Sequence, residues 1–103
     1  MSDVLTRIKR AVLAGDIVFT AKARIEMRVD GLAEMDVIES IVNAIAIQKK
    51  IRSTSEARRQ IREYLYIIVS TNLNGMPIYT KGKLVSEAGR DTYYLLISSK
   101  RSL

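Results

Sequence analysis

Cysteine and histidine are both absent from this sequence. Without cysteine the chain has no disulfide, no thiolate metal ligand and no cysteine nucleophile. Without histidine it lacks the commonest general base and a major zinc ligand. Any chemistry must therefore use lysine, arginine, tyrosine or carboxylate side chains, and we expect no cofactor and no metal site.

Long hydrophobic runs are missing too. The first ten residues carry four charged side chains, so no signal-peptide core is expected there, and no later run approaches the roughly 18 apolar residues of a membrane helix. We therefore expect a cytoplasmic protein with no membrane contact. Proline occurs once and glycine five times among 103 residues, 48% of which are hydrophobic, and this composition indicates a single domain over residues 1–103.

The net charge of +6 is unevenly distributed. Residues 1–45 hold six Lys/Arg against seven Asp/Glu, whereas residues 46–103 hold eleven against four, a net charge of +7 for the second part. This concentration of positive charge favours a polyanionic partner such as RNA. A plain solubilising surface would have the same composition.

Helices are predicted in the first half of the chain. Apolar residues recur at helical spacing over residues 3–14, Thr20 can cap a second helix that runs to about Val29, and a third helix is expected over residues 34–45. Between the first two helices, residues 17–19 are interpreted as a short apolar link. The first half therefore predicts three packed helices.

The hydrophobic period changes from 3.6 to 2 in the second half. Residues 63–71, 77–85 and 92–99 are rich in Tyr, Ile, Val and Thr, and short turn segments separate them, which predicts an antiparallel meander. A further edge strand is expected near residues 45–52. The sequence therefore predicts an α+β fold in which three N-terminal helices pack on a three- to four-stranded antiparallel sheet.

In the middle predicted strand, residues 77–85, successive side chains point to opposite faces of the sheet. Every second residue suits a core against the helices: Ile78, Thr80 and Leu84. The residues between them are one tyrosine and two lysines: Tyr79, Lys81 and Lys83. Like charges about 7 Å apart on a central strand are costly unless an anion compensates them, so this row favours an anionic ligand, with a solvated face as the alternative. Both faces of residues 92–99 are apolar, so the pattern does not orient the last strand.

A basic segment leads into the predicted sheet. Its Lys and Arg residues are Lys49, Lys50, Arg52, Arg58, Arg59 and Arg62. Small residues lie between them, and this mixture is typical of a loop that follows a phosphate backbone, although an ordinary solvated loop has it as well.

Three other classes of site fit poorly. A helix-turn-helix reader would put the predicted helix 34–45 in a groove, but that helix holds three carboxylates and no Lys or Arg. A two-metal nuclease needs clustered carboxylates, and the four in the basic half are scattered. The glycines occur singly, so there is no glycine-rich phosphate loop.

Several short motifs, in this order along the chain, resemble the MqsR-like (motility quorum-sensing regulator) ribonuclease toxins and a related group of small uncharacterised proteins. The motifs are Ala14-Gly15, Phe19-Thr20-Ala21-Lys22-Ala23, Tyr79-Thr80-Lys81-Gly82-Lys83 and Leu96-Ile97-Ser98-Ser99-Lys100-Arg101. Both groups are similar to members of the RelE/ParE superfamily, so the resemblance implies a RelE-like domain. The uncharacterised relatives often have His-Ala where this chain has Lys22-Ala23, so any role of that histidine would be altered here.

The resemblance implies a toxin of a type II toxin-antitoxin system that cleaves RNA without a metal ion. The toxin site consists of a lysine before the sheet, a glutamine, a tyrosine on a strand and a lysine on the last strand. These positions correspond to Lys50 or, almost equally well, Lys49, and to Gln60, Tyr79 and Lys100. The longer interval here between the tyrosine and the last lysine departs from the family pattern.

In such a site the ribose 2′-hydroxyl attacks the adjacent phosphate. We expect catalytic roles for Lys50, Tyr79, Lys81 and Lys100, with Lys81 as a base whose neighbour Lys83 favours its neutral form. The residues expected to bind RNA are Lys49, Arg52, Arg58, Arg59, Gln60, Lys83 and Arg101. The expected partners are RNA and a cognate antitoxin protein, and self-association into a homo-oligomer is left open. The alternative function is a module that binds RNA or protein without cleavage, including a degenerate toxin that only binds its antitoxin.

Overall fold

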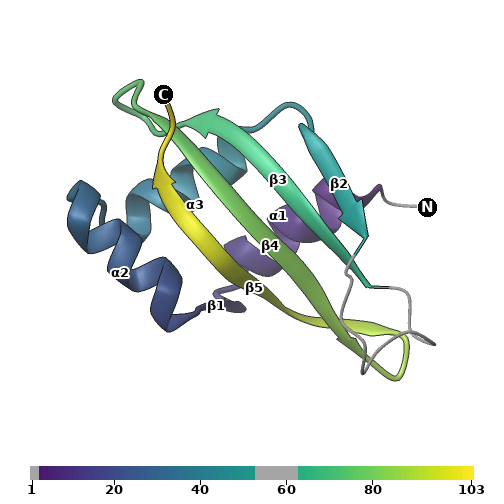
Figure 1. Ribbon diagram of the computed structural model, residues 1–103. Coiled ribbons are helices and arrows are strands. Elements are labelled where there is room, and N and C mark those ends of the chain that lie inside the picture. Colours follow the sequence, from purple (N-terminus) through teal and green to yellow (C-terminus); the bar gives the residue numbers. More distant parts are fainter. Residues whose placement is uncertain (1–2, 53–62) are drawn as a thin grey trace.

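The computed structural model describes residues 3–52 and 63–103 (Figure 1). In chain order its elements are α1 (Val4–Leu13), β1 (Ile17–Phe19), α2 (Ala21–Asp30), α3 (Glu34–Asn43), β2 (Lys49–Arg52), β3 (Tyr64–Thr71), β4 (Pro77–Glu87) and β5 (Arg90–Arg101). The helices lie close to the ranges that the sequence predicts. No helix in the described part of the chain is long and apolar enough to cross a membrane.

The sheet differs from the predicted one. It has five strands in the order β1-β5-β4-β3-β2, and β1 runs parallel to β5, so the expectation of a purely antiparallel sheet of three or four strands was wrong. The additional strand is the segment at residues 17–19 that was interpreted as a link. A three-residue segment is too short to show a period. Its pairing partner, Tyr94–Leu96, lies far along the sequence.

The ends of the helices follow from local hydrogen bonds. The Asp3 carboxylate accepts from Thr6 N at 2.8 Å at the start of α1, and the Thr20 hydroxyl accepts from Ala23 N at 3.1 Å at the start of α2. Gly31 ends α2 with φ of 70°, a left-handed conformation that glycine adopts without strain. These caps place α2 directly after β1, where it packs beside β5.

Helices cover one face of the sheet. Figure 1 shows α1 and α3 behind the strands and α2 beside β5. The core between the layers includes Ile8, Val37, Ile41, Ile68, Ile78, Tyr94 and Leu96, all of them almost completely buried. On β4, Ile78 and Thr80 are buried in this core, so the predicted alternation along this strand is correct.

The opposite sheet face is covered by no helix among the described residues, and we call it the open face (Figure 1). Strand register assigns to it Lys49, Ile51, Leu65, Ile67, Val69, Tyr79, Lys81, Lys83, Tyr93, Leu95 and Lys100. Aliphatic and basic side chains are thus interleaved on this face.

A β-bulge sets the orientation of the last strand. Lys81 pairs with Ser98 but the next residue, Gly82, pairs with Leu96, which leaves Ile97 as an extra residue in β5. A bulge exchanges the faces of the residues beyond it. Tyr94 therefore points into the core, whereas Lys100 points to the open face.

Candidate nucleic-acid interface

The centre of the open face is formed by β4. Tyr79 lies between Val69 of β3 and Lys100 of β5, and both neighbours are direct cross-strand partners. Two residues further along β4, Lys81 pairs with Ile67 of β3 on the same face. These side chains are close enough to meet a single extended ligand.

Tyr79 and Lys100 form the closest pair on this face. The Lys100 ammonium lies 5.3 Å from the centroid of the Tyr79 ring, within range of a cation–π interaction. Next to this pair is a depression of about 470 Å³, lined by Tyr79, Lys100, Arg101, Ser102 and Leu103. The structure thus brings together three of the predicted site residues: Tyr79, Lys100 and Arg101.

Two carboxylates of α2 hold the end of β5 that carries Lys100. Glu26 Oε1 accepts from Ser98 Oγ at 2.7 Å and from Ser99 N at 3.1 Å, and Asp30 Oδ2 accepts from Arg101 N at 2.8 Å. Successive turns of α2 therefore satisfy two backbone donors at the edge of the sheet, where no strand pairs with them in the described chain.

The Glu26 carboxylate remains ionised in this setting. Partial burial alone would raise the pKa of Glu26, but the hydrogen bonds from Ser98 and Ser99 outweigh it, with a further contribution from the Lys22 ammonium 3.2 Å away. The pKa therefore lies below its usual value. Lys22 thus supports the attachment of β5 to α2 through Glu26 and Asp30, which we call the clamp.

The two alternative lysines of β2 fall on opposite faces. Lys49 pairs with Ile67 and belongs to the open face, next to the row that contains Lys81. Lys50 pairs with Tyr66 on the helix-covered side, and its ammonium lies 4.1 Å from the centroid of the Tyr64 ring. The structure therefore groups Lys49, and not Lys50, with the predicted site.

The other predicted residues are divided in the same way. Arg52 pairs with Tyr64 and shares the side of Lys50, whereas Lys83 lies on the open face. Its ammonium is 3.7 Å from Glu63 Oε2. Arg58, Arg59 and Gln60 lie outside the described residues. In residues 3–52 and 63–103, no three acidic side chains gather in a way that could hold a metal ion.

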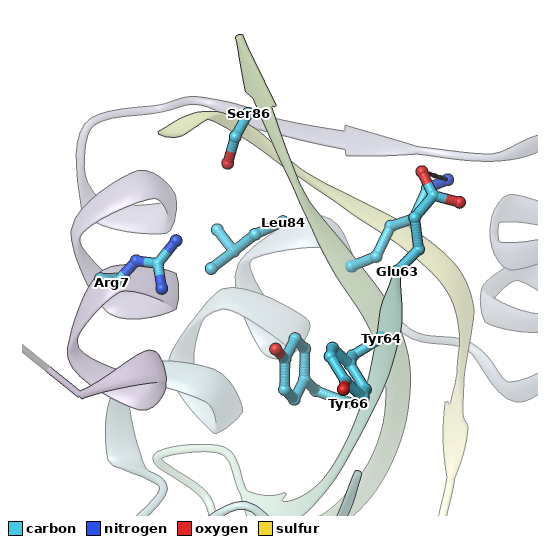
Figure 2. Close-up of a pocket in the computed structure, with 7 residues that line it drawn as sticks. Arg7, Glu63, Tyr64, Tyr66, Leu84 and Ser86 are labelled. Carbon is cyan, nitrogen blue, oxygen red and sulfur yellow. Dashed lines mark ion pairs between the residues drawn. The ribbon is translucent and has the colours of Figure 1, made fainter. Parts of the chain in front are cut away.

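A second concavity, of about 250 Å³, lies between α1 and the end of the β3–β4 ladder (Figure 2). We call it the tyrosine pocket, and it is lined by Arg7, Glu63, Tyr64, Tyr66, Lys83, Leu84 and Ser86. In Figure 2 the Tyr66 ring extends from β3 toward the helix that carries Arg7. Burial raises the pKa of Tyr66, and the positive charge of Arg7 opposes that effect only in part.

Arg7 is fixed in place by a carboxylate on β5. Its Nε and Nη2 donate to Asp91 at 2.9 and 2.7 Å, and Ser86 Oγ donates to the same carboxylate at 3.0 Å. The hydrogen bonds from Arg7 hold the pKa of Asp91 below its usual range. No sequence pattern indicates this pair, because the two residues are 84 positions apart.

No known protein family, curated protein or solved structure matches this chain. The likeness to the MqsR-like toxins therefore depends on the short motifs quoted above.

Proposed function

We propose that this protein binds single-stranded RNA along the open face and cleaves it there without a metal ion, as a cytoplasmic toxin of the RelE/ParE kind. The observation that supports the proposal best is the gathering of Tyr79, Lys81, Lys100 and Lys49 on the one sheet face that no described helix covers.

Binding would use charge and stacking together. Lys81 and Lys83 are two positions apart on β4, about 7 Å, and can contact successive phosphates of an extended strand. The Tyr79 ring offers a surface for one base, and aliphatic neighbours such as Ile67 and Val69 supply apolar contact. Unpaired bases rather than a duplex suit such a face, because aromatic side chains stack on bases that have left the helix.

Cleavage needs a base, an acid and stabilisation of negative charge. In the proposed reaction the Lys81 amine takes the proton of the ribose 2′-hydroxyl, and the 2′-oxygen forms a bond to the adjacent phosphorus. The bond from phosphorus to the 5′-oxygen breaks, and the Tyr79 phenol donates its proton to that oxygen. Lys100 stabilises the charge on the phosphorane. The products are a 2′,3′-cyclic phosphate and a free 5′-hydroxyl.

The test compares cleavage and binding of one end-labelled RNA by purified variants. For a ribonuclease, Tyr79→Phe and Lys100→Ala should each lower turnover by about 10²- to 10⁴-fold, the usual contribution of such groups. Lys50→Ala is the matched control, because Lys50 lies on the other side of the sheet. Unchanged turnover in both site variants would refute the site.

A second candidate function is RNA binding without cleavage. It is favoured by the open geometry, because Lys81 and Lys83 lie on a surface of the described sheet and not in an enclosed cleft that excludes water. In that case Lys81→Ala should lower affinity and reduce the salt dependence by about one phosphate contact, while Tyr79→Phe should be nearly silent since the ring still stacks. Wild-type protein that binds RNA but leaves every RNA intact would establish this alternative.

A toxin of this kind also needs a protein that silences it. We propose a cognate antitoxin whose acidic segment covers Lys81 and Lys83 while its apolar side chains contact residues such as Ile67 and Val69. Expression alone should arrest growth, and co-expression of the operon neighbour should relieve the arrest through salt-sensitive binding. Growth that is unaffected by expression would argue against the toxin role. A homo-oligomer through the same face would instead appear as a concentration-dependent mass in the absence of the neighbour.

A further inference from the structure

The tyrosine pocket lies at the far end of β4 from the Tyr79–Lys100 pair. The ladder of β3 and β4 extends from Thr71–Pro77 to Tyr66–Gly82, and the pocket adjoins its Tyr66–Gly82 end. One wall comes from α1 and the opposite wall from β3, as Figure 2 shows. The pocket is thus a separate feature from the depression beside Tyr79.

The lining of the pocket combines flat aromatic surface with hydrogen-bonding groups. Tyr64 and Tyr66 supply two rings, and Leu84 supplies an apolar contact. Arg7 and Ser86 supply polar atoms at positions fixed by their hydrogen bonds to a common carboxylate. Stacking surface and oriented polar groups together are what a nucleobase requires, since its faces are apolar and its edges polar.

The volume points to a small ligand. A cavity of about 250 Å³ lies below the usual range for drug-sized molecules, roughly 300–1,000 Å³, and suits a single planar ring system. The surrounding charge favours a ligand attached to phosphate. The Lys50 ammonium lies over the Tyr64 ring at 4.1 Å, and Lys83 borders the pocket with its ammonium 3.7 Å from the Glu63 carboxylate.

Lys83 connects the pocket to the open face. The Lys83 side chain belongs to the row on the open face that contains Tyr79 and Lys81, and the residue also borders the pocket. The described β3–β4 pairing ends at Tyr66–Gly82, so an RNA backbone that follows β4 from Tyr79 past Lys83 can pass over this end of the ladder and turn its next base into the pocket on the helix-covered side. The Lys83 pairing with Glu63 is long, at 3.7 Å, and a phosphate can replace it at small cost.

We propose that the tyrosine pocket receives one unpaired nucleobase of an RNA whose backbone lies along β4. This inference rests on the proposed binding of RNA by the open face, and it adds a subsite at one end of the path. The base stacks against the tyrosine rings and directs its polar edge toward Arg7 and Ser86. One nucleotide of the bound stretch is thereby held more tightly than its neighbours.

The test is an abasic scan with oligouridylates of about eight nucleotides, labelled at one end, in which each base in turn is removed. With wild-type protein, removal of the base that occupies the pocket should weaken binding roughly 5- to 100-fold, the usual effect of losing one stacked base. A second sensitive position, several nucleotides away, is expected at Tyr79.

Two variants test whether the pocket causes the loss of affinity at the first sensitive position. Ser86→Trp fills the mouth of the pocket from an exposed position, and Tyr64→Leu removes one ring; each should abolish the penalty at the first position and leave the Tyr79 position unchanged. Ser86→Ala is the size control: it loses one polar contact but leaves the rings and the space free, so it should retain both penalties, with the first one somewhat reduced. Tyr79→Leu should abolish only the second. Thermal unfolding of each variant shows whether its fold is intact, and Ser86→Trp provides the answer if Tyr64→Leu does not fold.

The outcomes separate this inference from the proposed function. A scan with no sensitive position besides that of Tyr79, or a penalty that persists in Ser86→Trp, would overturn the pocket assignment while RNA binding stands. Wild-type protein that shows no salt-dependent affinity for any of these oligonucleotides would overturn both. A penalty lost in Ser86→Trp but retained in Ser86→Ala would support the pocket.

Discussion

Glu26→Ala should destabilise the protein far more than other substitutions at partly exposed carboxylates. Glu26 Oε1 accepts two hydrogen bonds from β5, one from the Ser98 hydroxyl and one from the Ser99 amide, and both donors belong to residues that are almost fully buried. Alanine leaves these donors without an acceptor among the described residues. The end of β5, which carries Lys100, would then lose part of its attachment to α2.

The size of the effect follows from these two bonds. Hydrogen bonds to a charged acceptor contribute roughly 1.5–3 kcal/mol each, and two bonds to one oxygen are not fully additive. We expect Glu26→Ala to lower the free energy of unfolding by about 2–4 kcal/mol, a large part of the 5–15 kcal/mol that is typical of a domain. The melting temperature should fall by roughly 4–8 °C per kcal/mol. Glu26→Gln keeps an acceptor oxygen and should cost only about 1 kcal/mol.

Urea unfolding followed by circular dichroism measures these differences. Glu34→Ala is the matched control, since Glu34 pairs with Arg24 while both side chains are 51% exposed, and exposed pairs contribute about 1 kcal/mol at most. If Glu26→Ala costs no more than Glu34→Ala, the clamp does not hold β5. The pH dependence gives a second check. The folded-state pKa of Glu26 is lowered, so its carboxylate stabilises the fold above the unfolded pKa, and this stabilisation disappears as the pH falls through the folded pKa. The advantage of wild type over Glu26→Gln should therefore shrink as the pH falls below the ordinary pKa of a glutamate, about 4.3.

Three further substitutions test other parts of the structure. Gly82→Ala should cost about 2–3 kcal/mol in urea unfolding, because a Cβ there would lie 2.7 Å from Cζ of the Tyr94 ring; a loss below about 0.5 kcal/mol would contradict the packing. Lys49→Ala should weaken RNA binding and lower the slope of log affinity against log salt concentration by about 0.7. Lys50→Ala should change the affinity by less than about twofold when the oligonucleotide is too short to reach the tyrosine pocket. Equal effects of the two variants would contradict the placement of Lys49 and Lys50 on opposite faces. Asp91→Asn should lower the free energy of unfolding at about pH 7 by only about 1 kcal/mol, because the ion pair of Asp91 with Arg7 is partly exposed. A much larger loss would show that this ion pair holds α1 on the sheet.

The helices could be predicted from the sequence because their signals are local. Thr20 and Gly31 mark the two ends of α2 through hydrogen bonds to backbone groups within a few residues, and the structure contains those bonds. Alternation along β4 was equally local, and it placed Ile78 in the core and Tyr79 on the open face. Patterns within one element therefore predicted the three helices and the alternation of side chains along β4.

The part of the fold prediction that was wrong, and the choice between Lys49 and Lys50, depend on pairing between distant segments. Nothing within Ile17–Phe19 indicates that it pairs with residues almost eighty positions later, and so the fifth strand and the parallel pair were missed. The choice between Lys49 and Lys50 required the register of β2 against β3. Resemblance favoured Lys50 slightly, but a shift of one residue in a strand exchanges the two faces, and the register puts Lys49 on the open face.

The position of Lys100 combines both kinds of information. Simple alternation puts it on the same side as Tyr94, which would bury its charge in the core, and only the extra residue Ile97 brings it beside Tyr79. The sequence feature that marks this bulge is Gly82, a single glycine in a central strand that lies opposite the shift in register. At this point the Tyr94 ring and the Leu95 carbonyl would both lie 2.7 Å from any Cβ on residue 82, so only glycine lets the two strands and the ring approach in this way. The glycine in the motif around Tyr79 is therefore connected to the lysine on the last strand by packing. For that reason, replacement of Gly82 should disturb the Tyr79–Lys100 pair as well as the core.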